Sequence, residues 1–252
     1  MKRAGIISQV RMGSTRLPSK VLLPAAGRPL LDYHVARLRQ SGLPIFLATT
    51  TEPADDVLAT YAETNQIPYH RGSETDVLAR YYGTAQEFGL DVIVRVTSDC
   101  PLVDGPLIGA AVGRYIEENN PLAYRSNSII RSFPRGLDFE IFSMQLLAEA
   151  HTIATLPYER EHVTPYIKTN PATAGRVVFR DEVWPGGDFS RFRITLDTAE
   201  DYAVLRALIA DYHADQLDVP NLLALLEAHP EIMALNAHIE QKATGFCPTR
   251  CA

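Results

Sequence analysis

The sequence predicts an α/β fold in which helices flank a mostly parallel, Rossmann-like sheet. Apolar runs of strand length alternate with amphipathic stretches of helix length through the first half of the chain, a pattern typical of parallel strands joined by crossover helices. The 252 residues are 46% hydrophobic and 21% charged, so the chain can bury a large core. We therefore expect one domain over residues 1–246, followed by a short tail at 247–252.

Four apolar runs in the first half are expected to be strands, at residues 4–8, 44–50, 67–70 and 91–96. Helices are expected at residues 29–40, from about residue 53, at 75–88 and at 103–118. The second of these has Asp55 and Asp56 in its first turn, where the helix dipole favours anions. This half of the chain predicts a doubly wound sheet, a fold that binds nucleotides at the carboxyl ends of its strands.

After Asn119 the apolar rhythm becomes irregular. The breaks Asn-Asn-Pro, Phe-Pro-Arg-Gly and Trp-Pro-Gly-Gly favour loops, so residues 119–187 are expected to form an added β-rich arm. The run FRITL at 192–196 predicts a strand that returns to the main sheet. Thr198 is expected to cap a helix that reaches about residue 211, and residues 220–242 are expected to be helical.

The overall charge excludes one broad class of function. The chain has a formal net charge of -6, whereas general binding to nucleic acid needs a clustered basic surface. The N-terminal apolar run is too short for a signal peptide or a membrane span, so we expect a cytoplasmic protein with no membrane partner. The odd number of cysteines fits a reducing compartment, and Cys247 and Cys251 are expected to lie in a frayed tail rather than to bind a metal.

The segment QVRMGSTRLPSKVL, residues 9–22, lies between the first strand and the first helix, where an open parallel sheet binds its ligand. Gly13 lets the main chain approach an oxyanion closely. Cations flank this glycine on Arg11, Arg16 and Lys20, and guanidinium forks match phosphate oxygens. Neither the usual ATPase loop nor the dinucleotide fingerprint is present. The segment therefore predicts phosphate binding, with a basic surface loop balanced by nearby carboxylates as the alternative.

The same loop resembles the signature of the sugar-acid cytidylyltransferases, the family of the CMP-KDO and CMP-sialic acid synthetases. That signature has an Arg-x-Gly-Ser-x-Arg-x-Pro-x-Lys core, which this chain matches at Arg11, Gly13, Ser14, Arg16, Pro18 and Lys20. Gln9 stands where those synthetases usually have proline, and this indicates the branch of SpsF-like spore coat polysaccharide biosynthesis proteins. Four further motifs follow in order up to about residue 210: RGSETDVLARYY, RVTSDCPLVD, YEREHVTPYI and LDTAED.

The resemblance implies a nucleotide-diphospho-sugar transferase fold and an Mg²⁺-dependent enzyme. The implied reaction transfers CMP from CTP to a sugar acid for surface polysaccharide or glycoconjugate synthesis, and pyrophosphate is the second product. The nucleotide-binding residues expected on this basis are Arg11, Met12, Gly13, Ser14, Arg16, Lys20, Arg71, Ser73, Asp76, Thr97 and Ser98. Val77 stands where the KDO synthetases have arginine, and a helix cap at Thr75 is an alternative explanation for part of this motif.

Asp99 and Asp197 each follow a predicted strand, at the end where a parallel sheet presents its ligands. Mg²⁺ prefers one or two carboxylates together with water and substrate phosphate oxygens. Taken alone, Asp197 also suits a helix cap in competition with Thr198, and Asp99 suits a turn before Pro101. In the family resembled, an aspartate at each position carries the Mg²⁺, so both are predicted metal ligands, whereas Asp104 is interpreted as the cap of the next helix.

The expected chemistry is positioning and charge neutralisation, because no nucleophilic serine or cysteine is required when an acceptor oxygen attacks the α-phosphorus. The predicted catalytic residues are Arg11, Lys20, Asp99 and Asp197. Polar residues of the irregular half are expected to bind the acceptor: Arg135, Asp138, Glu140, Arg160 and His162. His162 also suits a structural or surface position, since it lies beside two glutamates.

Three other functions remain open at this point. A pyrophosphorylase acting on a sugar 1-phosphate with another nucleotide would share the fold and the metal site. A nucleotide-sugar-dependent glycosyltransferase is disfavoured because the motif TSDCP lacks an Asp-x-Asp pair. A non-catalytic nucleotide-sugar sensor would need neither metal carboxylates nor loop cations.

A homodimer formed through residues 119–187 is also expected, from the habit of the family and from Phe133 and Trp184, which are expected to be exposed.

Overall fold

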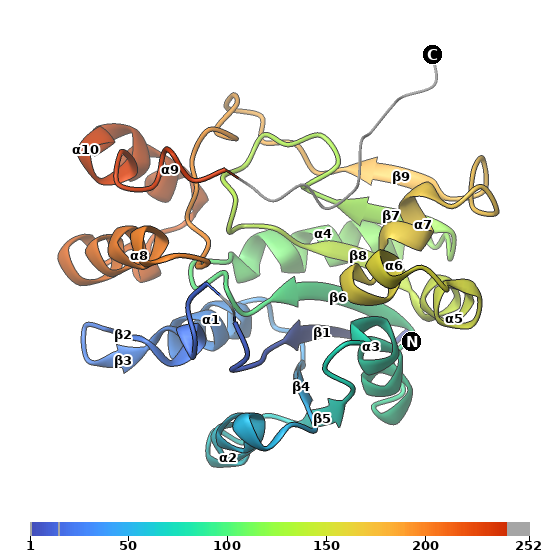
Figure 1. The fold of residues 1–252 in the computed structure, drawn as a ribbon. Coiled ribbons are helices and arrows are strands. Elements are labelled where there is room, and N and C mark those ends of the chain that lie inside the picture. Colours follow the sequence, from blue (N-terminus) through green and yellow to red (C-terminus); the bar gives the residue numbers. More distant parts are fainter. Residues whose placement is uncertain (1, 15, 241–252) are drawn as a thin grey trace.

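The computed structural model describes residues 2–14 and 16–240, and its centre is a seven-stranded sheet in the order β5-β4-β1-β6-β8-β7-β9 (Figure 1). The strands are β1 (Ala4–Gln9), β4 (Ile45–Thr50), β5 (Tyr69–Gly72), β6 (Val92–Thr97), β7 (Ala123–Ser126), β8 (Glu140–Ser143) and β9 (Val178–Asp181). Strands β5, β4, β1 and β6 are parallel, β8 is antiparallel to both of its neighbours, and β9 is parallel to β7. A short hairpin of β2 (Pro24–Ala25) and β3 (Arg28–Pro29) lies apart from this sheet.

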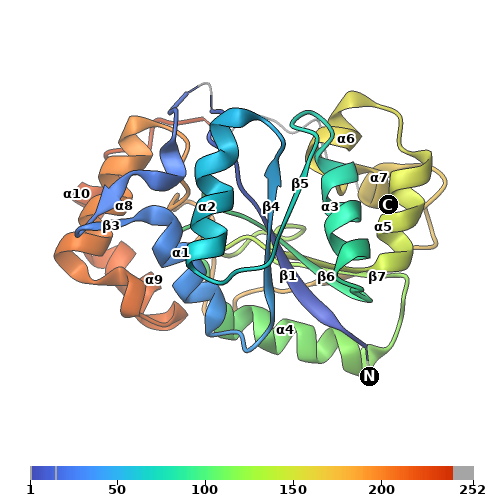
Figure 2. The same ribbon diagram turned by 90° about the horizontal axis from the view of Figure 1, so that it is seen from below.

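Helices cover both faces of the sheet. They are α1 (Leu30–Arg39), α2 (Asp56–Thr64), α3 (Val77–Glu87), α4 (Gly105–Glu118), α5 (Met144–Ile153), α6 (Pro157–His162), α7 (Pro165–Thr169), α8 (Ala199–Tyr212), α9 (Val219–Ala228) and α10 (Pro230–Met233). Single 3₁₀ turns are η1 (Lys20–Leu22), η2 (Pro53–Asp55) and η3 (Ala214–Gln216). Figure 2 shows α3 and α5 on one side of strands β1 and β4 and α1 on the other.

The two faces follow from the alternation of apolar residues along the strands. Adjacent residues of a strand point to opposite faces, so Ile6 packs in the cluster that contains α1 and α4, whereas Ile7 packs in the cluster that contains α3 and α5. A third apolar cluster joins α8, α9 and α10 to Leu30 and to Leu196. The mostly parallel sheet with helices on both faces, and the predicted elements of the first half, are confirmed with small shifts at their ends.

The strand predicted at residues 192–196 is wrong. This segment is extended, but it makes only an isolated bridge between Arg193 and Arg135, and the amide of Leu196 donates to the Asp99 carbonyl. The position beside β6 in the main sheet is taken by β8, so β6 has no free side with which the segment could pair.

The added β-rich arm at residues 119–187 is also wrong in its details. Strands β7, β8 and β9 extend the main sheet instead of forming a separate arm, and the region also contains the three helices α5, α6 and α7. Tyr124 of β7 and Phe142 of β8 are buried in the cluster that contains α5, which explains why these short strands join the central layer. Phe133 is not exposed as expected: it is 2% exposed, and its ring packs edge-on against Trp184 at 5.7 Å between centroids.

The C-terminal part is less continuous than predicted. Helix α9 ends at Ala228 and α10 begins at Pro230, because proline has no amide hydrogen to continue the first helix but suits the first turn of a second. The predicted helix at 220–242 therefore divides in two, and its end lies outside the described residues, as do the predicted tail, Cys247 and Cys251. Within residues 2–14 and 16–240, no helix has the length and apolar character that a membrane span requires.

Both predicted caps are confirmed. Asp104 accepts from the amide of Leu107 at the start of α4, and Thr198 accepts from the amide of Asp201 at the start of α8. Asp197 is therefore free of the capping role that the sequence left open.

A buried histidine ties α1 to the ends of two strands. His34 Nδ1 donates to the Cys100 carbonyl at 2.8 Å, so Nε2 carries no proton and accepts from the Ser8 hydroxyl, also at 2.8 Å. Burial lowers the pKa of His34 from 6.5 to about 4, which keeps the imidazole neutral at neutral pH. The histidine therefore supports the backbone next to Asp99 without adding charge.

The His34 arrangement predicts an acid-sensitive component of stability. The unfolded chain protonates this imidazole below pH 6.5 and the folded chain only near pH 4, so the free energy of unfolding should fall across that window by about 3 kcal/mol from this group. Urea denaturation of the wild type and of His34→Gln between pH 4 and 7 measures the difference. Parallel stability curves for the two proteins would contradict the assignment.

Candidate active site

A cavity of about 570 Å³ lies at the carboxyl ends of β1 and β6. The loop after β1 forms one wall, the start of α3 another, and the segments after β6 and before α8 a third. Of the predicted nucleotide-binding residues it is lined by Arg11, Gly13, Ser14, Arg16, Lys20, Thr97 and Ser98, and it is also lined by Asp99, Asp197 and His162. The structure thus brings the phosphate loop and both predicted metal carboxylates to one cavity.

Asp55 anchors the phosphate loop, whereas the sequence predicted only a favourable charge for it in the first turn of a helix. Asp55 Oδ1 accepts from the backbone amide of Met12 at 2.7 Å, and its other oxygen accepts from the hydroxyl of Thr50. Met12 therefore acts through its main chain, while its side chain packs against the core. The backbone amide of Ser19 closes the loop by donating to the Met12 carbonyl at 3.1 Å.

Gly13 leaves room for the Glu74 side chain where the loop faces the start of α3. A Cβ atom at this position would lie 2.9 Å from Glu74 Oε1, closer than such atoms normally approach. Arg11 and Glu74 form an ion pair at 3.3 Å with both side chains substantially exposed, so this contact contributes little to stability and can open. Arg11 and Gly13 therefore lie beside a gap that a ligand can enter without breaking a strong contact.

The two aspartates meet around a lysine. Lys20 Nζ lies 3.2 Å from Asp99 Oδ2 and 2.8 Å from Asp197 Oδ1, and it also donates to the Leu196 carbonyl at 2.6 Å. Thr97 Oγ1 donates to the other oxygen of Asp99 at 2.5 Å. A single cation therefore bridges two carboxylates that are far apart in the sequence.

The protonation states of this cluster follow from its charges. Burial alone raises the pKa of Asp197, but the charge of Lys20, followed by Arg16 and a bond from Arg193, outweighs it and holds the pKa below the usual value. Burial alone lowers the pKa of Lys20, but Asp99 and Asp197 outweigh it and raise the pKa above the usual value. At neutral pH Asp197 is therefore ionised and Lys20 carries its proton.

The carboxylate pair fits Mg²⁺ better than a metal that needs a full protein cage. In the part of the chain that the structure describes, no group of three or more histidine, cysteine, aspartate or glutamate side chains is placed to hold a metal. Two carboxylates that already share a cation, next to a cavity lined by loop cations, match an ion that keeps water and substrate phosphate as its other ligands.

The residues predicted for the nucleobase lie outside the lining of this cavity. Arg71 pairs with Asp56 at 2.7 Å, and Ser73 Oγ accepts from the amide of Asp76 at 3.1 Å. Asp76, rather than Thr75 as the alternative explanation had it, caps α3 by accepting from the amide of Ala79 at 2.9 Å. The lining at this end is made instead by Glu74, Thr75, Val77 and Arg80.

Arg80 is a site residue that the sequence analysis missed. It lies on the buried side of α3, is 2% exposed, and donates from Nη1 to the Ser73 carbonyl at 2.6 Å, while its Nε has no hydrogen-bond partner within the described residues. Burial lowers its pKa, as expected for a guanidinium without a bonded carboxylate. An arginine on the apolar face of a predicted helix was the available signal.

A second cavity of about 300 Å³ adjoins the first, and Thr97 lines both. Three of the predicted acceptor residues, Arg135, Asp138 and Glu140, line it together with Arg95, Arg131 and Lys168. His162 lines the first cavity instead. Arg160 lines neither, because its guanidinium is bound to Asp76 at 2.5 Å.

Glu140 binds four side chains, two cations and two hydroxyl groups. It forms ion pairs with Arg95 and, at 3.2 Å, with Lys168, and it accepts from the hydroxyls of Tyr124 and, at 2.8 Å, Thr164. Burial alone raises the pKa of Glu140, but Lys168 and Arg95 outweigh it and hold the pKa far below the usual value. This carboxylate is committed to supporting the cavity wall.

Replacing Glu140 by glutamine should therefore destabilise the fold. The change removes the charge of a buried carboxylate that pairs with the partly buried cations Arg95 and Lys168, so we expect a loss of about 3–5 kcal/mol in the free energy of unfolding. Urea denaturation measures this, and Glu117→Gln on the exposed side of α4 serves as the matched control. A loss no larger than that of the control would show that Glu140 has no structural role.

Comparison with known proteins agrees with the geometry. The family model described as cytidylyltransferase matches residues 4–243. The spore coat polysaccharide biosynthesis protein SpsF of Bacillus subtilis is 33% identical over 233 residues, which cover 89% of this chain and 94% of that protein. The 3-deoxy-manno-octulosonate cytidylyltransferase of Herminiimonas arsenicoxydans is 29% identical over 163 residues, 62% of this chain and 64% of that enzyme.

One solved structure supports the same assignment over the whole chain. A cytidylyltransferase from Leptospira borgpetersenii serovar Hardjo-bovis is 33% identical and superimposes with a TM-score of 0.85, covering 96% of this chain and 100% of that chain. The range that the family model matches includes the sheet, the phosphate loop and both aspartates. The chain belongs to the cytidylyltransferase family and is a nucleotidyltransferase.

Proposed function

We propose that this protein transfers CMP from CTP to a sugar acid in the cytoplasm, with Mg²⁺, as a step in surface polysaccharide or glycoconjugate synthesis. The observation that carries the proposal is the meeting of Asp99, Asp197 and Lys20 beside a cavity lined by loop cations. The names of the two relatives support the sugar and the pathway class. The family supports CTP as the nucleotide.

The loop residues bind the triphosphate in this proposal. Arg11, Arg16 and Lys20 neutralise the charge that moves onto the leaving pyrophosphate, and the backbone at Gly13 and Ser14 approaches the phosphates. Arg80 adds a buried cation at the α3 end of the cavity. Thr97 and Ser98 line the cavity. Ser73 and Asp76 would shape the base end by holding the start of α3, and Arg71 by binding the Thr50 carbonyl at the end of β4.

The carboxylates of Asp99 and Asp197 would hold the metal. Bound there, Mg²⁺ would supply Lewis-acid polarisation of a phosphate oxygen. The acceptor hydroxyl oxygen forms the new bond to the α-phosphorus, the bond to the pyrophosphate oxygen breaks, and the hydroxyl proton is released. Catalysis by the chain itself consists of holding these groups in line and stabilising the charge.

The second cavity would hold the sugar acid. Its lining has four cationic side chains, Arg95, Arg131, Arg135 and Lys168, and two carboxylates, Asp138 and Glu140, so it carries an excess of positive charge. Arg135 would pair with the acceptor carboxylate, which guanidinium groups bind in a two-point geometry, and Asp138 would accept from a sugar hydroxyl. His162 would lie between acceptor and nucleotide, and Arg160 would act by holding Asp76.

Pyrophosphate release tests the proposal. Each of the four nucleoside triphosphates is offered with Mg²⁺ and a panel of sugar acids and sugar phosphates. We expect release with CTP and a sugar acid, and a loss of at least about 100-fold in Asp99→Asn and Asp197→Asn, because each loses a group that stabilises transition-state charge. Asp211→Asn, an exposed aspartate at the end of α8, is the matched control.

The same assay separates the rival functions. Release with another nucleotide and a sugar 1-phosphate would move the protein to the pyrophosphorylases. Tight nucleotide binding without release would favour a glycosyltransferase or a sensor. Arg135→Gln should raise the KM for the acceptor and leave the KM for CTP unchanged, and equal effects on both would contradict the assignment of the second cavity.

We also propose that the protein forms a homodimer through residues 119–187. Strand β9 lies at an edge of the sheet, and Phe179 on it and Val183 beyond it are 41% and 49% exposed. Covering these apolar side chains would favour association. Light scattering should give twice the chain mass of 27.9 kDa, whereas a mass of one chain would exclude the dimer.

A further inference from the structure

Arg193 is buried beside the active site and is absent from the predicted set of site residues. Its Nε and Nη2 atoms bind the two carboxylate oxygens of Asp201 at 2.8 and 2.9 Å, and the same Nη2 lies 2.9 Å from Asp197 Oδ2. Arg193 is 7% exposed and Asp201 is fully buried. The guanidinium therefore joins a buried carboxylate to one that lines the cavity.

Asp201 holds Asp197 from a second side. Its Oδ2 accepts from the backbone amide of Asp197 at 3.0 Å and from that of Thr198 at 3.2 Å. The main chain of Asp197 is thus fixed directly, and its side chain is fixed through Arg193. Asp201 lies in the first turn of α8, whereas Arg193 lies in the extended segment that precedes this helix.

The two oxygens of Asp197 consequently have different surroundings. Oδ2 faces Arg193 at 2.9 Å and Arg16 at 3.2 Å, whereas Oδ1 faces Lys20 and, across that lysine, Asp99. Rotation of the carboxylate would break the bond to Arg193. Only Oδ1 is therefore presented to a cation that Asp99 shares.

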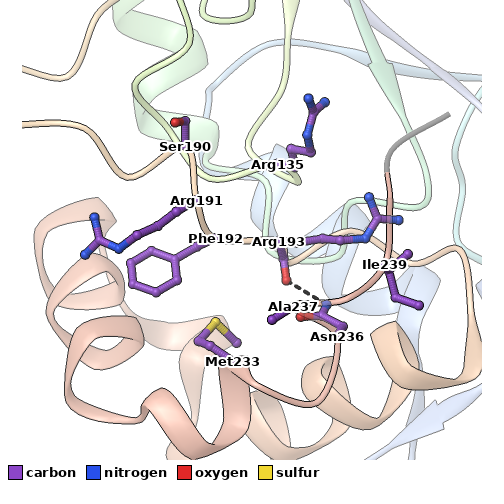
Figure 3. A pocket seen from close by; sticks show the side chains of 9 residues that line it. All are labelled: Arg135, Ser190, Arg191, Phe192, Arg193, Met233, Asn236, Ala237 and Ile239. Atoms are coloured by element: carbon purple, nitrogen blue, oxygen red, sulfur yellow. Dashed lines mark hydrogen bonds between the residues drawn. The ribbon is translucent and has the colours of Figure 1, made fainter. Parts of the chain in front are cut away.

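Asn236, in the turn after α10, also contacts this arrangement. Its side-chain amide donates to the Arg193 carbonyl at 3.0 Å and to Asp201 Oδ1 at 2.8 Å. Figure 3 shows this bond to the Arg193 backbone, and it shows the guanidinium groups of Arg135, Arg191 and Arg193 pointing in three different directions. The guanidinium of Arg193 is directed toward Asp197 and Asp201.

We propose that Arg193 is a positioning residue that restricts Asp197 to one-oxygen ligation of the active-site metal and so favours Mg²⁺ over Ca²⁺. The inference rests on the proposed function, since it takes Asp197 as a metal ligand. Mg²⁺ demands near-ideal octahedral geometry, whereas Ca²⁺ accepts two-oxygen carboxylates in flexible coordination. Groups that orient metal ligands typically change metal affinity by about 10- to 100-fold when removed.

Calorimetric titration of CTP tests this without turnover. The wild type, Arg193→Met and Arg193→Lys are each titrated in EDTA, in Mg²⁺ and in Ca²⁺. The gain in CTP affinity due to Mg²⁺ should fall by roughly 10- to 100-fold in Arg193→Met, with a smaller loss in Ca²⁺ and little change in EDTA. Arg193→Lys keeps the charge but lacks the fork that spans two carboxylates, so it should also lose Mg²⁺ preference.

The outcomes separate this inference from the function on which it rests. Arg191→Met, two residues away and paired with Glu227, controls for the loss of an arginine in the same segment, and melting temperatures establish folding. If Arg193→Met does not fold, the effect of Mg²⁺ on CTP affinity is compared in Arg193→Lys and Asn236→Ala instead. If the folded variants show the same increase in CTP affinity with Mg²⁺ as the wild type, the inference is overturned and the proposed function is not. If the wild type binds no CTP in the presence of Mg²⁺, the proposed function is overturned.

Discussion

The bridge that Lys20 makes between Asp99 and Asp197 requires three distant segments to meet. Lys20 lies in the loop after β1, Asp99 follows β6, and Asp197 precedes α8. Parallel pairing of β1 with β6 brings the first two to one edge of the sheet. The third has no place in the sheet, and the bond from the Leu196 amide to the Asp99 carbonyl holds it there instead. The sheet order and the loop contacts together create the site.

Much of this site is visible in the sequence because its local signals are strong. Apolar runs locate the ends of β1 and β6, and therefore the loop cations and Asp99. The supporting residues are less visible, because they act through contacts between distant segments. Asp55 reads as an ordinary helix-start aspartate until the structure shows it binding the Met12 amide, 43 residues away. In the sequence, Arg193 is one polar position in an alternating pattern that is typical of a strand. That alternation predicted that residues 192–196 belong to the sheet, which is wrong.

The second half was harder to predict for a related reason. Strands β7, β8 and β9 have only four residues each, so their apolar alternation is too short to distinguish from a loop. The burial of β7 and β8 depends on α5, which packs Leu146 and Leu147 over Tyr124 and Phe142. A strand that is defined by a helix later in the chain cannot be recognised from its own residues. Proline and glycine signals marked the breaks in this region, but they do not reveal what lies between the breaks.

The charged residues of the second cavity differ in whether their charge is already paired within the protein. Glu140 has two cations and two hydroxyl donors, and a buried charge that is already satisfied gains nothing from a ligand. Arg135 is different: its guanidinium makes no hydrogen bond or ion pair within residues 2–14 and 16–240. Burial, then the charge of nearby Arg131, lowers its pKa. A partly buried cation that lines a cavity beside another cation would be stabilised by an anion from outside, and this is the basis for the proposal that Arg135 pairs with the carboxylate of a sugar acid.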